Sequence, residues 1–237
     1  MNTLQIILLI VCSVLAIVFI AIRAKFGGLL GVMLKTLASF AFVATAIITM
    51  GTNYVDSSTR ITLSIFTLGF LLGMIGDILL DLKVVYPGND KYYLNAGMLS
   101  FGLGHLAYFS AFSMYAVNKF STDLLMPILV SVGAGILLTV AIILVSKKMK
   151  LEFGDYLIQT IVYSFLLTFM TVYTLILSIL GGAMWLGFVG MLLFFLSDIV
   201  LSMQYFGGKL ESKLLIIVNH GLYYSAQIVL VAVLMLL

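Results

Sequence analysis

Charged residues are scarce in this chain. Asp, Glu, Lys and Arg make up 9% of its 237 residues, and hydrophobic residues make up 63%, whereas soluble domains have about 25% charged residues. No polar stretch is long enough to form a separate soluble domain. These proportions exclude an ordinary soluble protein and indicate a polytopic integral membrane protein, with residues 1–237 forming a single transmembrane domain.

Several function classes lack their defining residues. The chain has one cysteine, Cys12, within an apolar run, so an intrachain disulfide is excluded and we interpret Cys12 as a small buried hydrophobe. No G-x-S-x-G motif, P-loop or G-x-G-x-x-G turn is present, so neither a serine hydrolase nor a nucleotide-driven pump has support. The lysines behind the net charge of +3 sit in short loops, and we expect no nucleic-acid partner.

Long hydrophobic runs are what the chain has in abundance. A membrane-spanning helix needs about 20 mostly apolar residues, and eight segments qualify. Short connections rich in turn residues, such as Gly181-Gly182, separate them. The sequence therefore predicts an all-α bundle of eight transmembrane helices, at residues 3–22, 31–50, 61–80, 94–116, 124–145, 155–180, 183–203 and 214–236.

The distribution of Lys and Arg predicts the orientation of this bundle. Ten of these residues fall at or near helix ends on one side, and only Arg60 and Lys119 fall on the other. Because cytoplasmic loops carry an excess of Lys and Arg, we expect both termini to face away from the cytoplasm. Compactness and charge bias favour a bacterial cytoplasmic membrane, although an internal eukaryotic membrane would give the same pattern. The ten residues are Arg23, Lys25, Lys35, Lys83, Lys91, Lys147, Lys148, Lys150, Lys209 and Lys213.

Two carboxylates, Asp77 and Asp198, interrupt the hydrophobic runs. A charged side chain at the centre of a membrane costs roughly 2.5–3.5 kcal/mol on insertion scales. Asp77 is predicted roughly 6 Å inside the cytoplasmic boundary, and Asp198 lies at a similar depth. Because low dielectric disfavours the charged form, one could stay protonated while the other is ionised, as in an acid/base pair. The alternative is a structural role, in helix packing or as a partner of Lys35.

Other polar residues are predicted in the same half of the membrane or near its midplane. Five of these polar residues lie on the last predicted helix, where spacings of three and four residues place them on one broad face. Such a face suits substrate or water binding, and hydrogen bonding between helices is the alternative. Lys35 could contact a phosphate or act as a topology anchor that reaches the interface. No third ligand with suitable spacing supports a metal site, and we expect no cofactor. The candidate binding residues are Lys35, His105, Tyr108, Tyr163, Asn219, His220, Tyr223, Tyr224 and Gln227.

An internal repeat relates the two halves of the chain. His105–Ala111 and His220–Ala226 both read H-x-x-Y-[FY]-S-A, and Asp77 and Asp198 lie upstream in similar D-I-[LV]-L segments. The matched helices lie four apart with the same orientation. This pattern predicts two parallel pseudo-repeats, 1–120 and 121–237, with chance similarity among apolar helices as the alternative.

The segments G-D-I-L-L, G-H-L-A-Y-F-S-A-F, L-S-D-I-V-L-S and L-Y-Y-S-A-Q occur in this order in an eight-helix frame. This set resembles the YhhN-like lysoplasmalogenase family of small integral membrane enzymes. The resemblance implies hydrolysis of the vinyl ether of a lysoplasmalogen, an alkenyl lysophospholipid, to a fatty aldehyde and a glycerophospho-alcohol. Such a reaction needs a proton donor, a stabilising anion and a water, and Asp77 and Asp198 are the candidates for the first two roles. The residues do not decide which aspartate is the acid.

Two other functions fit the same residues. Paired intramembrane acids on parallel repeats also occur in transporters, so a proton-coupled carrier of a lipid or small molecule is one alternative. A lipid-binding scaffold without turnover is another. The polar residues cluster on one side, which favours an enzyme, because alternating access needs a polar path to both faces. Headgroup preference and oligomeric state stay open.

Overall fold

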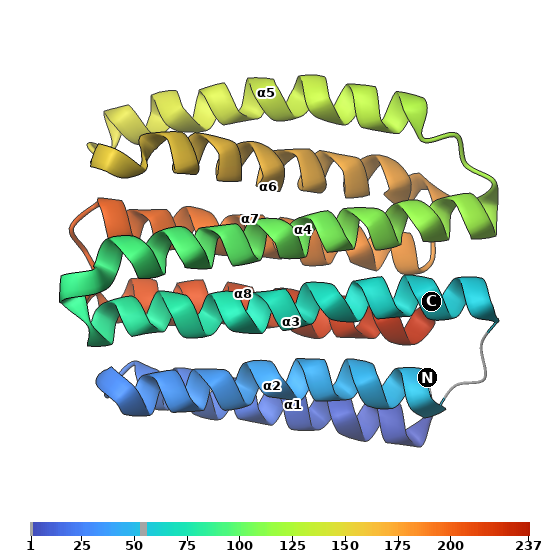
Figure 1. The fold of residues 1–237 in the computed structure, drawn as a ribbon, viewed down its shortest axis with the longest axis horizontal. Helices are drawn as coiled ribbons and strands as arrows, with labels where there is room; N and C mark the ends of the chain where they lie inside the picture. The colour runs from blue at the N-terminus through green and yellow to red at the C-terminus, as the bar shows by residue number, and fades with distance from the viewer. Residues whose placement is uncertain (1, 53–55) are drawn as a thin grey trace.

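The computed structural model describes residues 2–52 and 56–237, and the described residues form eight long helices with no strand (Figure 1). Three short 3₁₀ turns, at Pro87–Asn89, Gly154–Tyr156 and Ser178–Leu180, lie in the connections. The eight-helix fold predicted from the sequence is thus confirmed. The helices are α1 (Thr3–Arg23), α2 (Gly28–Thr52), α3 (Ser57–Val85), α4 (Asp90–Phe120), α5 (Leu125–Lys148), α6 (Leu157–Leu177), α7 (Ala183–Phe206) and α8 (Lys213–Leu236).

Seven of these helices are long and apolar enough to cross a membrane. The chain is therefore an integral multi-pass membrane protein. α4 falls outside this set because polar residues such as Asn95, Ser100 and His105 lower its hydropathy. The last two of these are buried, so α4 keeps part of its polar surface inside the bundle.

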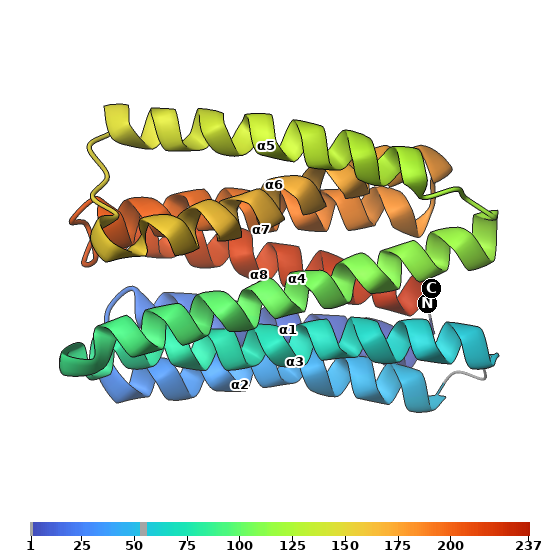
Figure 2. The ribbon, with the colours of Figure 1, turned by 45° about the horizontal axis from the view of Figure 1, so that its top comes forward.

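The helices run alternately up and down, and both termini lie at the same end of the bundle (Figures 1 and 2). α3 packs mainly on α4, and α7 mainly on α8. α5 lies at the edge in both views and packs on α6. Most of the predicted cytoplasmic Lys and Arg residues lie at helix ends or in loops at the end of the bundle opposite the termini. Which end faces the cytoplasm and the division into two pseudo-repeats stay predictions.

Glycines allow α3 and α4 to approach closely beside one of the aspartates. A Cβ atom on Gly76 would lie 2.6 Å from the Phe101 ring, and one on Gly97 would lie 2.6 Å from Leu80. Both distances are too short for an unshifted side chain, so these contacts require glycine. The tight packing fixes α3 immediately next to Asp77 and so holds that carboxylate in place.

Candidate functional site

Hydrogen-bond and ion-pair contacts join α2 and α3 inside the bundle. Lys35 and Ser39 are four residues apart on α2, and Asp77 and Asp81 are four residues apart on α3, so each pair lies on one helix face. Because the two helices are antiparallel, the pairs meet in register. Ser39 Oγ donates to Asp77 Oδ2 at 2.5 Å, and Lys35 Nζ lies 3.2 Å from Asp77 Oδ1 and 3.4 Å from Asp81 Oδ1.

Asp77, on α3, has polar partners on two other helices. Besides its contacts to α2, its Oδ2 accepts a hydrogen bond from the hydroxyl of Tyr223 on α8 at 2.7 Å. The residue is only 1% exposed. A buried carboxylate is tolerated when an opposite charge and hydrogen bonds compensate for its lost hydration, and Asp77 has both. It is therefore held in one orientation as part of an ion pair.

Asp81 extends the charged cluster toward the end of the bundle. Its Oδ2 lies 3.9 Å from the Nε of Arg23 on α1. Two cations, Lys35 and Arg23, thus face two carboxylates, Asp77 and Asp81, and the cluster is neutral when all four are ionised.

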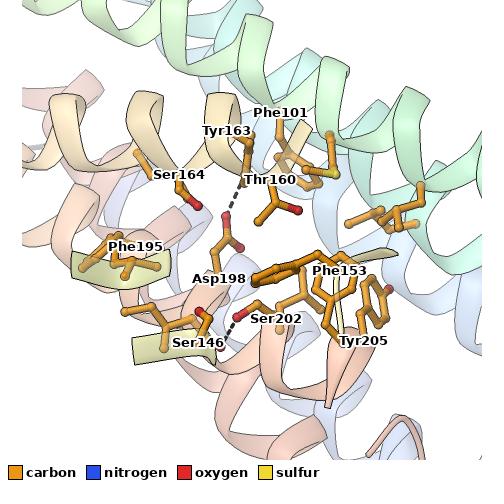
Figure 3. Close-up of a pocket in the computed structure, with 18 residues that line it drawn as sticks. Phe101, Ser146, Phe153, Thr160, Tyr163, Ser164, Phe195, Asp198, Ser202 and Tyr205 are labelled. Carbon is orange, nitrogen blue, oxygen red and sulfur yellow. Dashed lines mark hydrogen bonds between the residues drawn. The ribbon is translucent and has the colours of Figure 1, made fainter. Parts of the chain in front are cut away.

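Asp198 on α7 has a different environment. The hydroxyl of Tyr163 on α6 donates to its Oδ2 at 2.7 Å (Figure 3), and Ser197 Oγ lies 3.5 Å from its Oδ1. Among the described residues no Lys, Arg or His lies within 4.0 Å of this carboxyl group. Asn219 on α8 fixes the local backbone, since its Nδ2 donates to the carbonyl oxygen of Ser197 at 2.7 Å. Asp198 is therefore positioned by hydrogen bonds alone.

The two aspartates line one small space, which we call the aspartate cavity. Lys35, Asn219, His220 and Tyr223 contribute the rest of its polar lining, and Leu80, Phe101 and Leu201 contribute apolar surface. Carboxylates from α3 and α7, separated by more than 100 residues, are thus brought to the same place. A small group bound there would meet both.

A larger pocket, the apolar groove, adjoins the aspartate cavity. It lies among α3, α4, α5, α6 and α7 and is lined mostly by hydrophobic side chains (Figure 3). Its empty volume, which includes open solvent, is about 740 Å³. Both spaces share Leu80, Phe101, Asp198 and Leu201 as lining residues, so Asp198 stands where the groove meets the cavity.

A third space, the basic vestibule, opens at the lysine-rich end of the bundle. It shares Lys35, Leu201 and His220 with the aspartate cavity. Its empty volume, which includes open solvent, is about 1,510 Å³. The charged residues that line it are Arg23, Lys25, Lys35, Lys83 and Lys213, with Asp81, Asp90 and Glu211. The vestibule therefore has an excess of positive charge beside the cavity.

The predicted binding residues divide into two groups. Lys35, Asn219, His220 and Tyr223 line the aspartate cavity, and Tyr163 lines the apolar groove and binds Asp198. The interpretation of Lys35 as an anchor that reaches the membrane interface is wrong, because the residue is 5% exposed and paired with two carboxylates. It is drawn inward because those carboxylates lie on the adjacent helix.

The other four predicted residues, His105, Tyr108, Tyr224 and Gln227, line none of these three spaces. All are buried. The rings of the first two pack against aromatic side chains: His105 lies 4.6 Å from Phe194, and Tyr108 lies 4.9 Å from Phe66, between ring centroids. The Tyr224 hydroxyl lies 3.5 Å from Ser39 Oγ, one contact away from Asp77.

Sequence reasoning missed Ser39 and Asp81. Each lies four residues from a recognised candidate on the same helix, Lys35 and Asp77 respectively. That spacing places both pairs on one face and was a usable signal for Asp81. A serine in an apolar helix usually bonds to its own backbone, so nothing in the sequence pointed to Ser39.

Comparison with known protein families gives a match over most of the chain. A sequence model of the YhhN family matches residues 30–234, which include α3 to α7, nearly all of α2 and α8, and both aspartates. No curated protein and no solved structure matches the chain. Because the match covers most of its length, the chain belongs to the YhhN family.

Proposed function

We propose that this protein hydrolyses the vinyl ether of a lysoplasmalogen within the membrane. The products are a fatty aldehyde and a glycerophospho-alcohol, and one water is consumed. The observation that carries the proposal is the meeting of Asp77 and Asp198 at one cavity between an apolar groove and a basic vestibule.

The three adjoining spaces fit the three parts of this substrate. An alkenyl chain is apolar and suits the apolar groove, which lies among the helices. The phosphate of the headgroup is an anion and suits the vestibule, with its Arg and Lys side chains. The vinyl ether lies between these two parts of the molecule and would then occupy the aspartate cavity.

The charges around the two aspartates favour different roles for them. Lys35 and Arg23 already balance Asp77 and Asp81, and Asp198 has no cation within 4.0 Å among the described residues. An isolated carboxylate in a low-dielectric site is strongly disfavoured. We therefore assign the transferable proton to Asp198 and the stabilising negative charge to Asp77.

The reaction then proceeds in three steps. Asp198 protonates the vinyl carbon remote from the ether oxygen, which leaves an oxocarbenium ion beside the Asp77 carboxylate. Water adds to this cation and returns a proton to Asp198, giving a hemiacetal. Transfer of the hemiacetal hydroxyl proton to the glycerol oxygen breaks the C–O bond and releases the aldehyde and the alcohol. His220, which lines both the cavity and the vestibule, suits the role of positioning the water.

The lysine-rich loops favour an active site that opens to the cytoplasmic leaflet. Because Lys and Arg accumulate on cytoplasmic loops, the vestibule end would face the cytoplasm of a bacterial cell. A lysophospholipid could then enter from that leaflet with its headgroup remaining near the surface.

The test is aldehyde release from lysoplasmalogen by the purified protein in detergent. We expect turnover by the wild type and a loss of at least about 100-fold in Asp77→Asn and in Asp198→Asn, since acid–base groups typically contribute 10²–10⁴-fold. Asp155→Asn is the matched control, because Asp155 has a side chain 77% exposed at the surface. A folded wild type that releases no aldehyde would refute the proposal. Equal rates in all four proteins would refute the two-aspartate mechanism.

A further inference from the structure

One buried carboxylate oxygen lacks a hydrogen bond. Asp81 is 4% exposed, and its Oδ1 faces Lys35. Its Oδ2 has no hydrogen-bond donor among the described residues, since Arg23 Nε at 3.9 Å is too distant. Arg23 Nε likewise has no acceptor there. Buried polar atoms are nearly always paired, so such exceptions need an explanation.

The position of Asp81 suggests what its free oxygen meets. Asp81 follows Asp77 by one helical turn, roughly 6 Å along the axis. It lines the vestibule, whereas Asp77 lines the aspartate cavity. Lys35 contacts both carboxylates and lines both spaces. A substrate whose headgroup lies in the vestibule and whose reacting bond lies in the cavity therefore passes Asp81.

We propose that Asp81 Oδ2 accepts a hydrogen bond from the free hydroxyl on carbon 2 of the substrate glycerol, and so selects lysophospholipids over their 2-acylated counterparts. This inference rests on the proposed function. The carbon 2 hydroxyl oxygen is separated from the vinyl carbon that water attacks by the ether oxygen, carbon 1 and carbon 2, a span comparable to the rise between Asp77 and Asp81. The lysolipid hydroxyl is the donor that the buried oxygen lacks.

Acylation of carbon 2 removes this donor and adds bulk at the same point. The Asp81 carboxylate would then be buried against a group that cannot pair with it. Sites built to hydrogen-bond a substrate hydroxyl strongly reject analogues without it, because the buried protein group is left unpaired. Asp81 would in this way discriminate between the lysolipid and the 2-acylated lipid at carbon 2, because the two lipids have the same alkenyl chain and the same phosphate.

A purely structural role for Asp81, as a partner that holds Lys35 and Arg23, makes a different prediction. Its loss would then affect all substrates equally. Discrimination between a ligand with the hydroxyl and one without it separates the two roles.

The experiment measures binding of two non-hydrolysable ligands to the purified full-length protein. One is a saturated 1-O-alkyl-2-hydroxy-glycerophosphoethanolamine, and the other is its 2-deoxy analogue. Hydrogen bonds to charged groups justify an expected wild-type preference of about 10- to 100-fold for the hydroxylated ligand. In Asp81→Asn we expect the preference to fall to a few-fold, mainly through weaker binding of the hydroxylated ligand. Asp155→Asn is again the control and should keep the wild-type ratio.

Equal affinity of the wild type for the two ligands would overturn the inference, even if Asp81→Asn failed to fold. An unchanged ratio in folded Asp81→Asn would also overturn it. Because these ligands are not cleaved, the outcome is independent of turnover. If the wild type prefers the hydroxylated ligand and Asp81→Asn loses this preference, but no aldehyde is released from lysoplasmalogen, the proposed function is refuted and the role of Asp81 in binding the hydroxyl stands.

Discussion

Replacing Lys35 with methionine is the most informative single change to the charged cluster. Lys35 is 5% exposed, and its ammonium group lies 3.2 Å from Asp77 and 3.4 Å from Asp81. Methionine keeps much of the side-chain volume and removes the charge. Two buried carboxylates would then share Arg23, which lies 3.9 Å from one of them.

The burial of Lys35 determines how much stability the Lys35→Met substitution removes. An exposed ion pair contributes about 0–1 kcal/mol, whereas removal of one partner from a buried pair costs about 3–5 kcal/mol, because it leaves a charge uncompensated. Because Lys35 is buried, we expect Lys35→Met to lower the free energy of unfolding by about 3–5 kcal/mol. The double variant Lys35→Met/Asp77→Asn removes one charge of each sign. It should recover a large part of the loss, because Asp81 and Arg23 still balance one another.

The assay is reversible unfolding in mixed detergent and dodecyl sulfate micelles, followed by circular dichroism. Lys148→Met is the matched control, since Lys148 is exposed at the end of α5, and it should stay within about 1 kcal/mol of the wild type. A loss below about 1 kcal/mol for Lys35→Met would show that the pair is not buried as described. A double variant as unstable as the sum of its two single variants would show that the charges are not coupled.

Three further changes test other parts of the description. Tyr163→Phe removes the hydroxyl that donates to the α7 aspartate at 2.7 Å, and we expect slower aldehyde release with stability changed by about 0.5–1.5 kcal/mol; an unchanged rate would contradict this. Gly76→Ala places a methyl group 2.6 Å from an α4 ring and should cost about 1–3 kcal/mol in unfolding free energy, whereas Gly133→Ala, with open space around it, should be no less stable than the wild type. A cysteine at Lys209, in the α7–α8 connection, should react with a membrane-impermeant maleimide only after cells are opened, and labelling of intact cells would reverse the predicted orientation.

The helical fold was largely predictable because the thickness of a bilayer sets the length of each membrane-spanning apolar run. Eight apolar runs of about 20 residues predicted eight helices, and residues 2–52 and 56–237 form eight long helices. The predicted ends were short where helices continue past the hydrophobic run. α3 was predicted at 61–80 and spans Ser57–Val85, and α4 was predicted at 94–116 and spans Asp90–Phe120. Polar residues at helix ends carry no hydrophobic signal, so these extensions were invisible to hydropathy.

The site was predictable in depth but not in lateral position. Asp77 and Asp198 were singled out because carboxylates are costly in hydrocarbon, and depth alone grouped them with His105 and Tyr108. The structure instead places those two among aromatic rings, since the helix face that a residue occupies depends on which neighbours pack there. Periodicity within one helix does not identify its neighbours, so the pairing of Lys35 with α3 required the three-dimensional arrangement.

In the proposed reaction, water adds to the vinyl carbon of the ether, with Asp77 and Asp198 at the reacting bond. The most direct measurement is turnover of lysoplasmalogen in ¹⁸O-labelled water, followed by mass spectrometry of the glycerophospho-alcohol. We expect aldehyde to be formed and the alcohol to keep its original unlabelled oxygen, because water attacks the vinyl side. Label in the alcohol would contradict this proposal by showing cleavage on the glycerol side, and a folded protein that yields no aldehyde would contradict it outright.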